Sequence, residues 1–197
     1  MSRKTAKKLL KILLLFGMLG VAITLIVINT RNHRYKRSLE NYSIPDVTLI
    51  NQDNRPVRLI EYLNTDKPIV LEFIYTACTT VCPVMMVKFA NMQRRLEPDT
   101  EQARMVSISI DPENDSPEIL TGYRIHYQAR PGWDFLTGPP EAIHKVMAAF
   151  ETQATDMATL DSPILLRAPG SDRWVRLTGE IDSLTFWEEY KNMLKRE

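Results

Sequence analysis

The stretch PIVLEFIYTACTTVCPVMMVKFANMQRRL, residues 68–96, decides the fold of this chain. Its first part, Ile69–Tyr75, is an apolar run rich in residues that favour β-structure, which predicts a buried strand. Its second part predicts an amphipathic helix, because apolar residues recur there at spacings of three and four: Met85, Phe89, Met92 and Leu96. The chain is therefore expected to pass from a central strand directly into a helix.

The two cysteines of the chain, Cys78 and Cys82, lie between this strand and this helix. Pro83 fits the first helical turn, where a missing N–H is no loss. Both sulfurs are therefore expected at the N-terminal end of a helix, where backbone dipoles favour a thiolate and lower its pKa. Helical geometry separates Cα atoms four residues apart by about 6 Å. This spacing suits a disulfide, or two sulfur ligands of a soft metal ion such as Cu(I).

Two alternatives for the cysteine pair involve no chemistry: a purely structural disulfide, or two unrelated buried thiols. A disulfide that encloses only three residues removes little entropy from the unfolded chain, because its stabilisation grows with loop length. Chance rarely places the only two cysteines of a chain on one turn. The pair is therefore interpreted as a redox couple, a copper site, or both by turns.

The composition and the N-terminal sequence indicate one domain with an appendage. A formal net charge of +1 over 197 residues gives no argument for nucleic-acid binding. Residues Ile12–Ile28 carry no charge and nearly cover a bilayer core of about 30 Å. No small-residue cleavage signal follows, so an uncleaved signal anchor is expected at residues 12–30, after a cytoplasmic basic N-terminus at residues 1–11.

The predicted location follows from the flanks of this segment and from the cysteines. Basic residues on both sides nearly balance under the positive-inside rule, but a short basic N-terminus favours a cytoplasmic start. A redox or copper-binding cysteine pair suits an oxidising compartment. We therefore expect a single-pass protein of a bacterial inner membrane with its C-terminal domain in the periplasm. A basic linker at residues 31–40, which could rest on anionic lipid headgroups, would join the anchor to a domain at residues 41–197.

Further strands and helices alternate along the domain. In chain order we expect two short strands within Val47–Leu63, a strand at Ala103–Ile110, a helix from the N-cap Ser116 to about Gln128, a strand at Trp133–Gly138, a helix at Pro139–Phe150, a hairpin within Ser162–Gly179 and a helix at Ser183–Lys195. This order predicts an α/β domain with a central mixed sheet flanked by helices. A cysteine pair directly after an early central strand is the arrangement of a thioredoxin-like fold.

Three segments resemble successive signatures of the SCO/SenC family: FIYTACTTVCP at 73–83, SISIDPENDSPEILTGY at 107–123 and WDFLTG at 133–138. The resemblance runs from Val47 to the C-terminus. It implies a membrane-anchored, thioredoxin-like protein that binds copper and assists assembly of the dinuclear copper site of cytochrome c oxidase, some members acting mainly as thiol–disulfide reductants.

The resemblance also implies roles for particular residues. Cys78 and Cys82 match the two copper-ligating, redox-active cysteines of the family. Asp111 matches an acidic position near the site, although a turn or cap before Pro112 accounts for it equally well.

The sequence departs from this family at its third copper ligand, a histidine before the strand that begins the terminal hairpin. Asp161 or a neighbour stands at that place. The three histidines of the chain lie elsewhere: His33 in the linker, and His126 and His144 in helical patterns, where surface positions explain them.

Without an imidazole the predicted site favours Cu(I) over Cu(II). Two thiolates can hold soft Cu(I) in a linear arrangement, whereas Cu(II) prefers additional nitrogen or oxygen ligands. The carboxylate of Asp161 would be a hard ligand and a poor one for Cu(I). A thioether from Met157, Met85 or Met86 is a further possibility, although core packing explains at least one of the last two.

Pro163 suggests a redox role, because it opens the strand that faces the cysteine turn, where many thioredoxin-like proteins carry a cis-proline. In that role Cys78, expected to be the more exposed thiol at the helix start, would be the attacking thiolate. Three functions therefore remain open: a copper-handling assembly factor for the copper-containing subunit of an oxidase, a thiol–disulfide oxidoreductase acting on a copper-protein client, and a membrane-tethered interaction module.

Overall fold

The computed structural model describes residues 12–24, 35–153 and 162–195 of the chain. The chain divides into two compact units, Met1–Tyr35 and Lys36–Glu197. In the first unit, residues 12–24 form a helix. Within the described ranges, no helix is both long and apolar enough to cross a membrane. The anchor predicted for residues 12–30 extends past this helix into residues outside the described part, and it stays a prediction.

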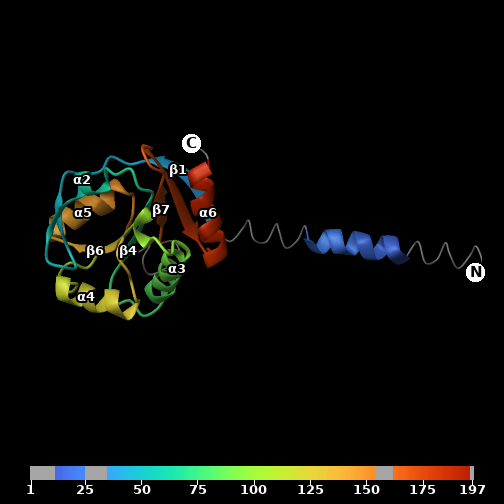
Figure 1. Cartoon of the computed structure of the whole chain (residues 1–197), viewed down its shortest axis with the longest axis horizontal. Coiled ribbons are helices and arrows are strands. Elements are labelled where there is room, and N and C mark those ends of the chain that lie inside the picture. Colours follow the sequence, from blue (N-terminus) through green and yellow to red (C-terminus); the bar gives the residue numbers. More distant parts are fainter. Residues whose placement is uncertain (1–11, 25–34, 154–161, 196–197) are drawn as a thin grey trace, which may run out of the picture. The chain divides into compact units, whose positions relative to one another are not determined.

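The second unit is built on an eight-stranded mixed sheet with the strand order β1-β8-β7-β4-β5-β6-β2-β3 (Figure 1). The strands are β1 (Tyr35–Asn41), β2 (Thr48–Asn51), β3 (Pro56–Arg58), β4 (Ile69–Ile74), β5 (Arg104–Ser109), β6 (Trp133–Thr137), β7 (Ile164–Arg167) and β8 (Arg173–Gly179). The central strands β4, β5 and β6 are parallel, and β7 pairs antiparallel with β4 and with β8. The predicted α/β domain with a central mixed sheet is confirmed.

Helices cover both faces of this sheet (Figure 1). They are α2 (Leu59–Leu63), α3 (Val81–Arg95), α4 (Pro117–His126), α5 (Pro140–Ala149) and α6 (Ser183–Lys195), with a short 3-10 turn at Thr100–Gln102. α4 begins as predicted, because the hydroxyl of Ser116 accepts a hydrogen bond from the backbone N–H of Ile119. The sequence therefore located each long helix of the domain correctly.

Strand β4 is the centre of the core, since all six of its residues are buried. On one face Phe73 packs against Phe150, which follows α5, with ring centroids 5.9 Å apart. On the other face Phe89 of α3 contacts Phe186 of α6 at 5.4 Å and Trp133 of β6 at 5.8 Å. Aromatic packing thus fixes Phe73 of β4, and a second aromatic cluster joins α3, the helix that carries Cys82, to α6 and β6.

Two expectations about local structure are wrong. Most of the predicted linker at residues 31–40 is strand β1, which pairs with β8 at the edge of the sheet. Its charged sequence gives no apolar alternation; the strand is held instead by tertiary contacts such as the 2.9 Å ion pair between Arg37 and Glu189. In addition, the chain after β3 forms the helix α2 where a strand was expected, because Leu59 and Leu63, four residues apart, are buried together as on a helix.

Candidate functional site

The cysteine pair lies at the C-terminal end of β4, as predicted. Cys78 belongs to the turn after the strand, and Cys82 lies in the first turn of α3. The N–H of Cys78 donates to the carbonyl oxygen of Tyr75 at 3.2 Å, which closes this turn. Both cysteines are free thiols, and both are buried: Cys78 is 5% exposed and Cys82 2%. Exposure therefore distinguishes the two sulfurs less than the sequence led us to expect.

Hydrogen bonds distinguish them clearly. The backbone N–H of Cys82 donates to Sγ of Cys78 at 3.3 Å. Burial alone would raise the pKa of the Cys78 thiol, but hydrogen bonds from the backbone of Cys82 and Thr80, the Cys82 thiol and the Tyr75 hydroxyl outweigh burial and lower it to about 6. Cys78 is therefore largely a thiolate at neutral pH.

Cys82 has the opposite character. Burial raises the pKa of its thiol to about 12, although a hydrogen bond from the backbone of Tyr75 opposes the shift. Its hydrogen bond to Cys78 and the nearby charges of Cys78 and Glu72 raise the pKa further. The site thus holds one thiolate and one thiol that supports it.

Tyr75 is a site residue that the sequence analysis missed. Its hydroxyl hydrogen-bonds Cys78, and this bond is the main reason that the pKa of Tyr75 is raised. The side chain of Tyr75 is partly exposed, whereas Cys78 is buried. The sequence could have indicated Tyr75 by its position, three residues before Cys78 at the end of a buried strand.

The acidic segment after β5 contributes Asp115 to the site and places Asp111 in a turn. Asp115 is fully buried, and its carboxylate accepts hydrogen bonds from the N–H of Thr76 at 3.1 Å and from the hydroxyls of Thr76 and Ser109, each at 2.5 Å. Asp111 is half-buried, and its carboxylate accepts from the side-chain amide of Asn114. The turn interpretation of Asp111 thus matches its contacts, whereas Asp115 joins this segment to the start of the cysteine turn.

A second buried carboxyl lies beneath the cysteines on β4. Glu72 is fully buried, and one of its oxygens accepts a hydrogen bond from Ser107 at 2.8 Å, while Oε2 has no partner. Ser107 also accepts from the indole N–H of Trp133 at 2.9 Å. Burial raises the pKa of Glu72 to about 8, although the charge of Lys88 on α3 opposes the shift. The sequence could have indicated this buried carboxyl, because Glu72 is the one acidic residue inside an apolar strand.

The described residues supply no third ligand beside the two sulfurs. No cluster of three or more His, Cys, Asp or Glu side chains in these ranges is arranged to hold a metal ion. His126 and His144 are exposed on α4 and α5. The other expected candidates, Asp161, Met157 and His33, lie outside the described residues.

The two methionines of α3 are part of the core. Met86 is fully buried, and Met85, 6% exposed, has its Sδ 3.8 Å from the ammonium group of Lys88. Core packing therefore accounts for both side chains. The remaining donor set of two thiol sulfurs, one of them already ionised, fits Cu(I), which is soft and tolerates two-fold coordination.

The hypothesis of a cis-proline at residue 163 is wrong. Within the described residues the cis peptide bond is Glu97–Pro98, and the bond between Ser162 and Pro163 is trans. Both of these residues are buried where the chain enters β7, which pairs with β4.

Comparison with known proteins places this site in a family. The sequence model of the SCO1/SenC family matches residues 37–164, a range that contains both cysteines and Asp115. A SCO1 protein homolog of Bacillus subtilis is 37% identical over 99 residues, which cover 50% of each chain. The chain thus spans about half the length of this relative.

Solved structures show the same fold. BsSco, a member of the Sco family of cytochrome c oxidase assembly proteins in which a disulfide switch was identified, aligns with a TM-score of 0.64 and 26% identity, covering 81% of this chain and 98% of its own. ScoI of Arabidopsis thaliana, solved with copper bound, aligns with a TM-score of 0.62 and 24% identity, covering 76% and 96%. The thioredoxin-like topology, the CxxxC turn at the end of β4 and the match over residues 37–164 lead to one conclusion: this chain belongs to the SCO1/SenC family.

Proposed function

We propose that this protein handles copper, as cargo, through Cys78 and Cys82 during assembly of the copper site of a respiratory oxidase. The observation that carries the proposal is the hydrogen bond from the Cys82 N–H to Sγ of Cys78, which holds a thiolate beside a second sulfur. An ionised sulfur at a helix start is ready to bind a soft cation without first losing a proton.

The chemistry of the donor set defines the cargo. Cys78 offers a thiolate, and Cys82 offers a thiol that must release its proton when the metal binds. Two such sulfurs satisfy linear Cu(I), while Cu(II) would need additional nitrogen or oxygen ligands. The protein is therefore a carrier of Cu(I) in preference to Cu(II).

The partner and location in this proposal follow from the family and from the N-terminal sequence. BsSco belongs to a family of cytochrome c oxidase assembly proteins, which supports the copper-containing subunit of a terminal oxidase, or another periplasmic copper protein, as the partner. The uncharged run at residues 12–28 would anchor the chain in a bacterial inner membrane with the domain in the periplasm.

A second candidate function is thiol–disulfide exchange, favoured by the difference in pKa between the two cysteines. The Cys78 thiolate would attack one sulfur of a client disulfide, and the other client sulfur would leave as a thiolate. Cys82 would then lose its proton and attack Cys78, which releases the second client sulfur and leaves a Cys78–Cys82 disulfide. The client gains two electrons, and a low-potential dithiol would reduce the protein again.

An anaerobic Cu(I) titration of the reduced full-length protein in detergent, against a chromophoric chelator, tests the first function. We expect one tightly bound equivalent, lost in Cys78→Ser and in Cys82→Ser. His144→Ala is the matched control, because His144 is exposed on α5, and it should leave binding unchanged. Absence of binding in the wild type would contradict copper handling.

Two further variants separate the candidates. Asp161→His restores an imidazole at the place where the family carries one, and a gain of Cu(II) affinity with this variant would show that the third position determines the oxidation state bound. Cys82→Ser leaves the attacking sulfur without its resolving partner. If the protein is an oxidoreductase, this variant should accumulate a mixed disulfide with a disulfide-containing copper-site peptide, and Cys78→Ser should not.

A further inference from the structure

The edge of the domain formed by β1, β8 and α6 carries a pocket of about 320 Å³ that the cysteine chemistry does not use. Two arginines, Arg37 and Arg173, line it together with the apolar side chains of Leu39, Val175 and Met193. Leu39 remains 51% exposed. A pocket that combines guanidinium groups with exposed apolar surface suits an amphiphile with an anionic head.

Helix α6 continues this chemistry along its outer side. Leu184, Trp187, Lys191 and Leu194 follow one another at spacings of three and four, so they form one stripe, and Lys195 extends it. Leu184 is 59% and Leu194 41% exposed, while Trp187 is partly exposed. Leucine, tryptophan and lysine on one helix stripe are the composition of a helix that lies at a membrane interface.

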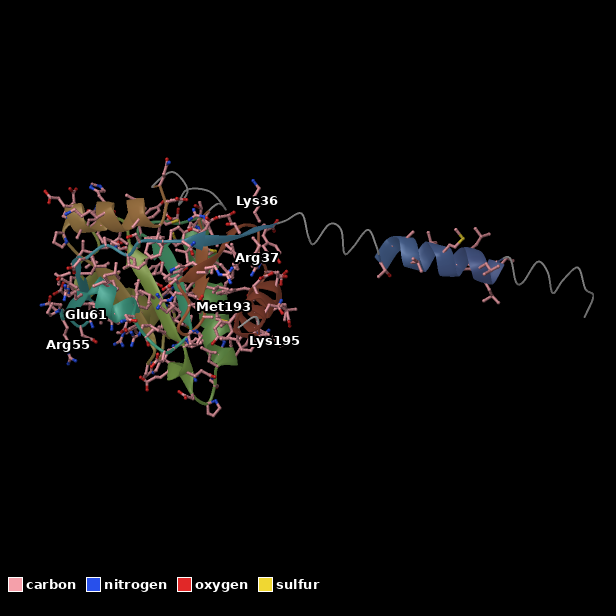
Figure 2. The ribbon with its side chains drawn as sticks, turned by 90° about the horizontal axis from the view of Figure 1, so that it is seen from above. Lys36, Arg37, Arg55, Glu61, Met193 and Lys195 are labelled. Carbon is pink, nitrogen blue, oxygen red and sulfur yellow. The ribbon has the colours of Figure 1, made fainter. Side chains whose placement is uncertain are left out.

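The stripe and the pocket both involve α6, at the edge of the domain where β1 lies. Figure 2 shows Lys36 and Arg37 of β1 at the same end of the domain as Met193 and Lys195 of α6, whereas Arg55 and Glu61 lie at the opposite end. The acidic groups of α6 are already engaged, because Glu189 pairs with Arg37 at 2.9 Å and Glu188 with Lys191 at 2.8 Å. Within the described part of the chain, Lys36, Arg173 and Lys195 make no ion pair and offer positive charge outward.

In the sequence, the proposed anchor lies only a few residues before β1, which forms part of this face. Only six residues separate the end of the uncharged run at Ile28 from the first residue of β1, Tyr35. A chain of that length reaches about 25 Å at most when fully extended. If the run is inserted in a bilayer, β1 must therefore stay within a short distance of the lipid headgroups.

We infer that the face formed by β1 and α6, including this pocket, docks on an anionic phospholipid surface and thereby fixes the orientation of the domain on its membrane. Lys36, Arg173 and Lys195 attract the anionic headgroups. The pocket holds one headgroup phosphate through Arg173 and the terminal N–H groups of Arg37, whose Nε is engaged by Glu189. The leucines and Trp187 of α6 enter the interface. This inference rests on the proposed membrane anchor, but it is independent of copper or thiol chemistry.

Tryptophan fluorescence of the full-length protein in nanodiscs with brominated acyl chains tests the inference. Trp133 and Trp174 are each only 1% exposed, so Trp187 is the tryptophan that lipid can reach. We expect quenching to be several-fold stronger in nanodiscs that contain phosphatidylglycerol than in pure phosphatidylcholine, and to weaken as salt is added. Trp187→Phe should abolish the difference.

A pair of charge reversals provides the matched comparison. Lys36→Glu should weaken the dependence on anionic lipid, whereas Arg55→Glu, which changes the net charge by the same amount at an exposed position at the opposite end of the domain, should preserve it. Equal quenching in both lipids, quenching that survives in Trp187→Phe, or equal loss in both charge variants would overturn the inference. Incorporation into neutral nanodiscs reports separately on the anchor: failure to incorporate rejects the anchor, while incorporation without lipid-dependent quenching rejects the docking face alone.

Discussion

The carboxylate of Asp115 accepts hydrogen bonds from both the backbone N–H and the hydroxyl of Thr76, two residues before Cys78. The backbone N–H is an obligatory donor, and here it lies in a turn that has left the β-ladder. Asp115 therefore supplies the bond that fixes where the cysteine turn begins. It lies in the segment before α4 and is remote from Thr76 in sequence, so this link is a tertiary one.

We predict that Asp115→Ala lowers the free energy of unfolding by about 3 kcal/mol, because buried donors on Thr76 and Ser109 lose their acceptor. Asp111→Ala, which removes a carboxylate bonded only to the neighbouring Asn114 side chain, should cost about 1 kcal/mol or less. Urea denaturation of both variants measures the difference. Equal losses in the free energy of unfolding would show that the two carboxylates stabilise the fold equally.

The reactivity of Cys78 should follow its lowered pKa. Only the thiolate is alkylated, so the rate of reaction with iodoacetamide should be nearly constant above pH 7 and fall as the pH drops through about 6. In Tyr75→Phe the midpoint should move to higher pH, because the variant loses a hydrogen bond that stabilises the thiolate. Stopped-flow alkylation of Cys82→Ser, with and without Tyr75→Phe, gives both profiles; a midpoint unchanged by Tyr75→Phe would contradict this role.

Glu72 should make stability depend on pH. Its carboxyl titrates near 4.5 when exposed and near 8 in the folded protein, so the unfolded state loses its proton first as the pH rises. The contribution of Glu72 to the free energy of unfolding is therefore greatest below about pH 4.5. It decreases by a few kcal/mol as the pH rises towards 8.

The variant Glu72→Gln keeps the hydrogen bond from Ser107 and removes the titration. Its free energy of unfolding should therefore lack this decrease between pH 5 and 8, whereas Glu113→Gln, at an exposed position, should behave as the wild type. Denaturation series across this pH range measure the contrast. A parallel decrease in Glu72→Gln would assign it to other groups.

Strand β1 should contribute to stability although its sequence resembles a linker. A chain that begins at residue 42 lacks β1 and removes Arg37 from the mostly buried Glu189. Its free energy of unfolding should be about 2 kcal/mol lower than that of a chain that begins at residue 34. Arg37→Met in the longer chain separates the ion pair from the strand. Identical thermal midpoints for the two chain lengths would show that β1 is only an appendage.

Much of this molecule follows from local sequence. Strand β4 was predictable because a strand buried on both faces requires a continuous apolar run. Helix α3 was predictable because a helix buried on one face repeats its apolar residues at spacings of three and four. The position of the cysteines at the helix start followed from their place between these two elements. The start of α4 was predictable because Ser116 and Pro117 are a cap and a first-turn residue.

Other features were decided only by the tertiary structure. Strand β1 is made of charged residues and exists because β8 and Glu189 lie beside it. Asp115 reaches the cysteine turn because the segment before α4, distant in sequence, packs beside Thr76. The sequence by itself therefore determined the cysteine turn and the strand and helix that carry it. The distinction between a thiolate at Cys78 and a thiol at Cys82 depends on hydrogen bonds and burial, which only the packed domain supplies.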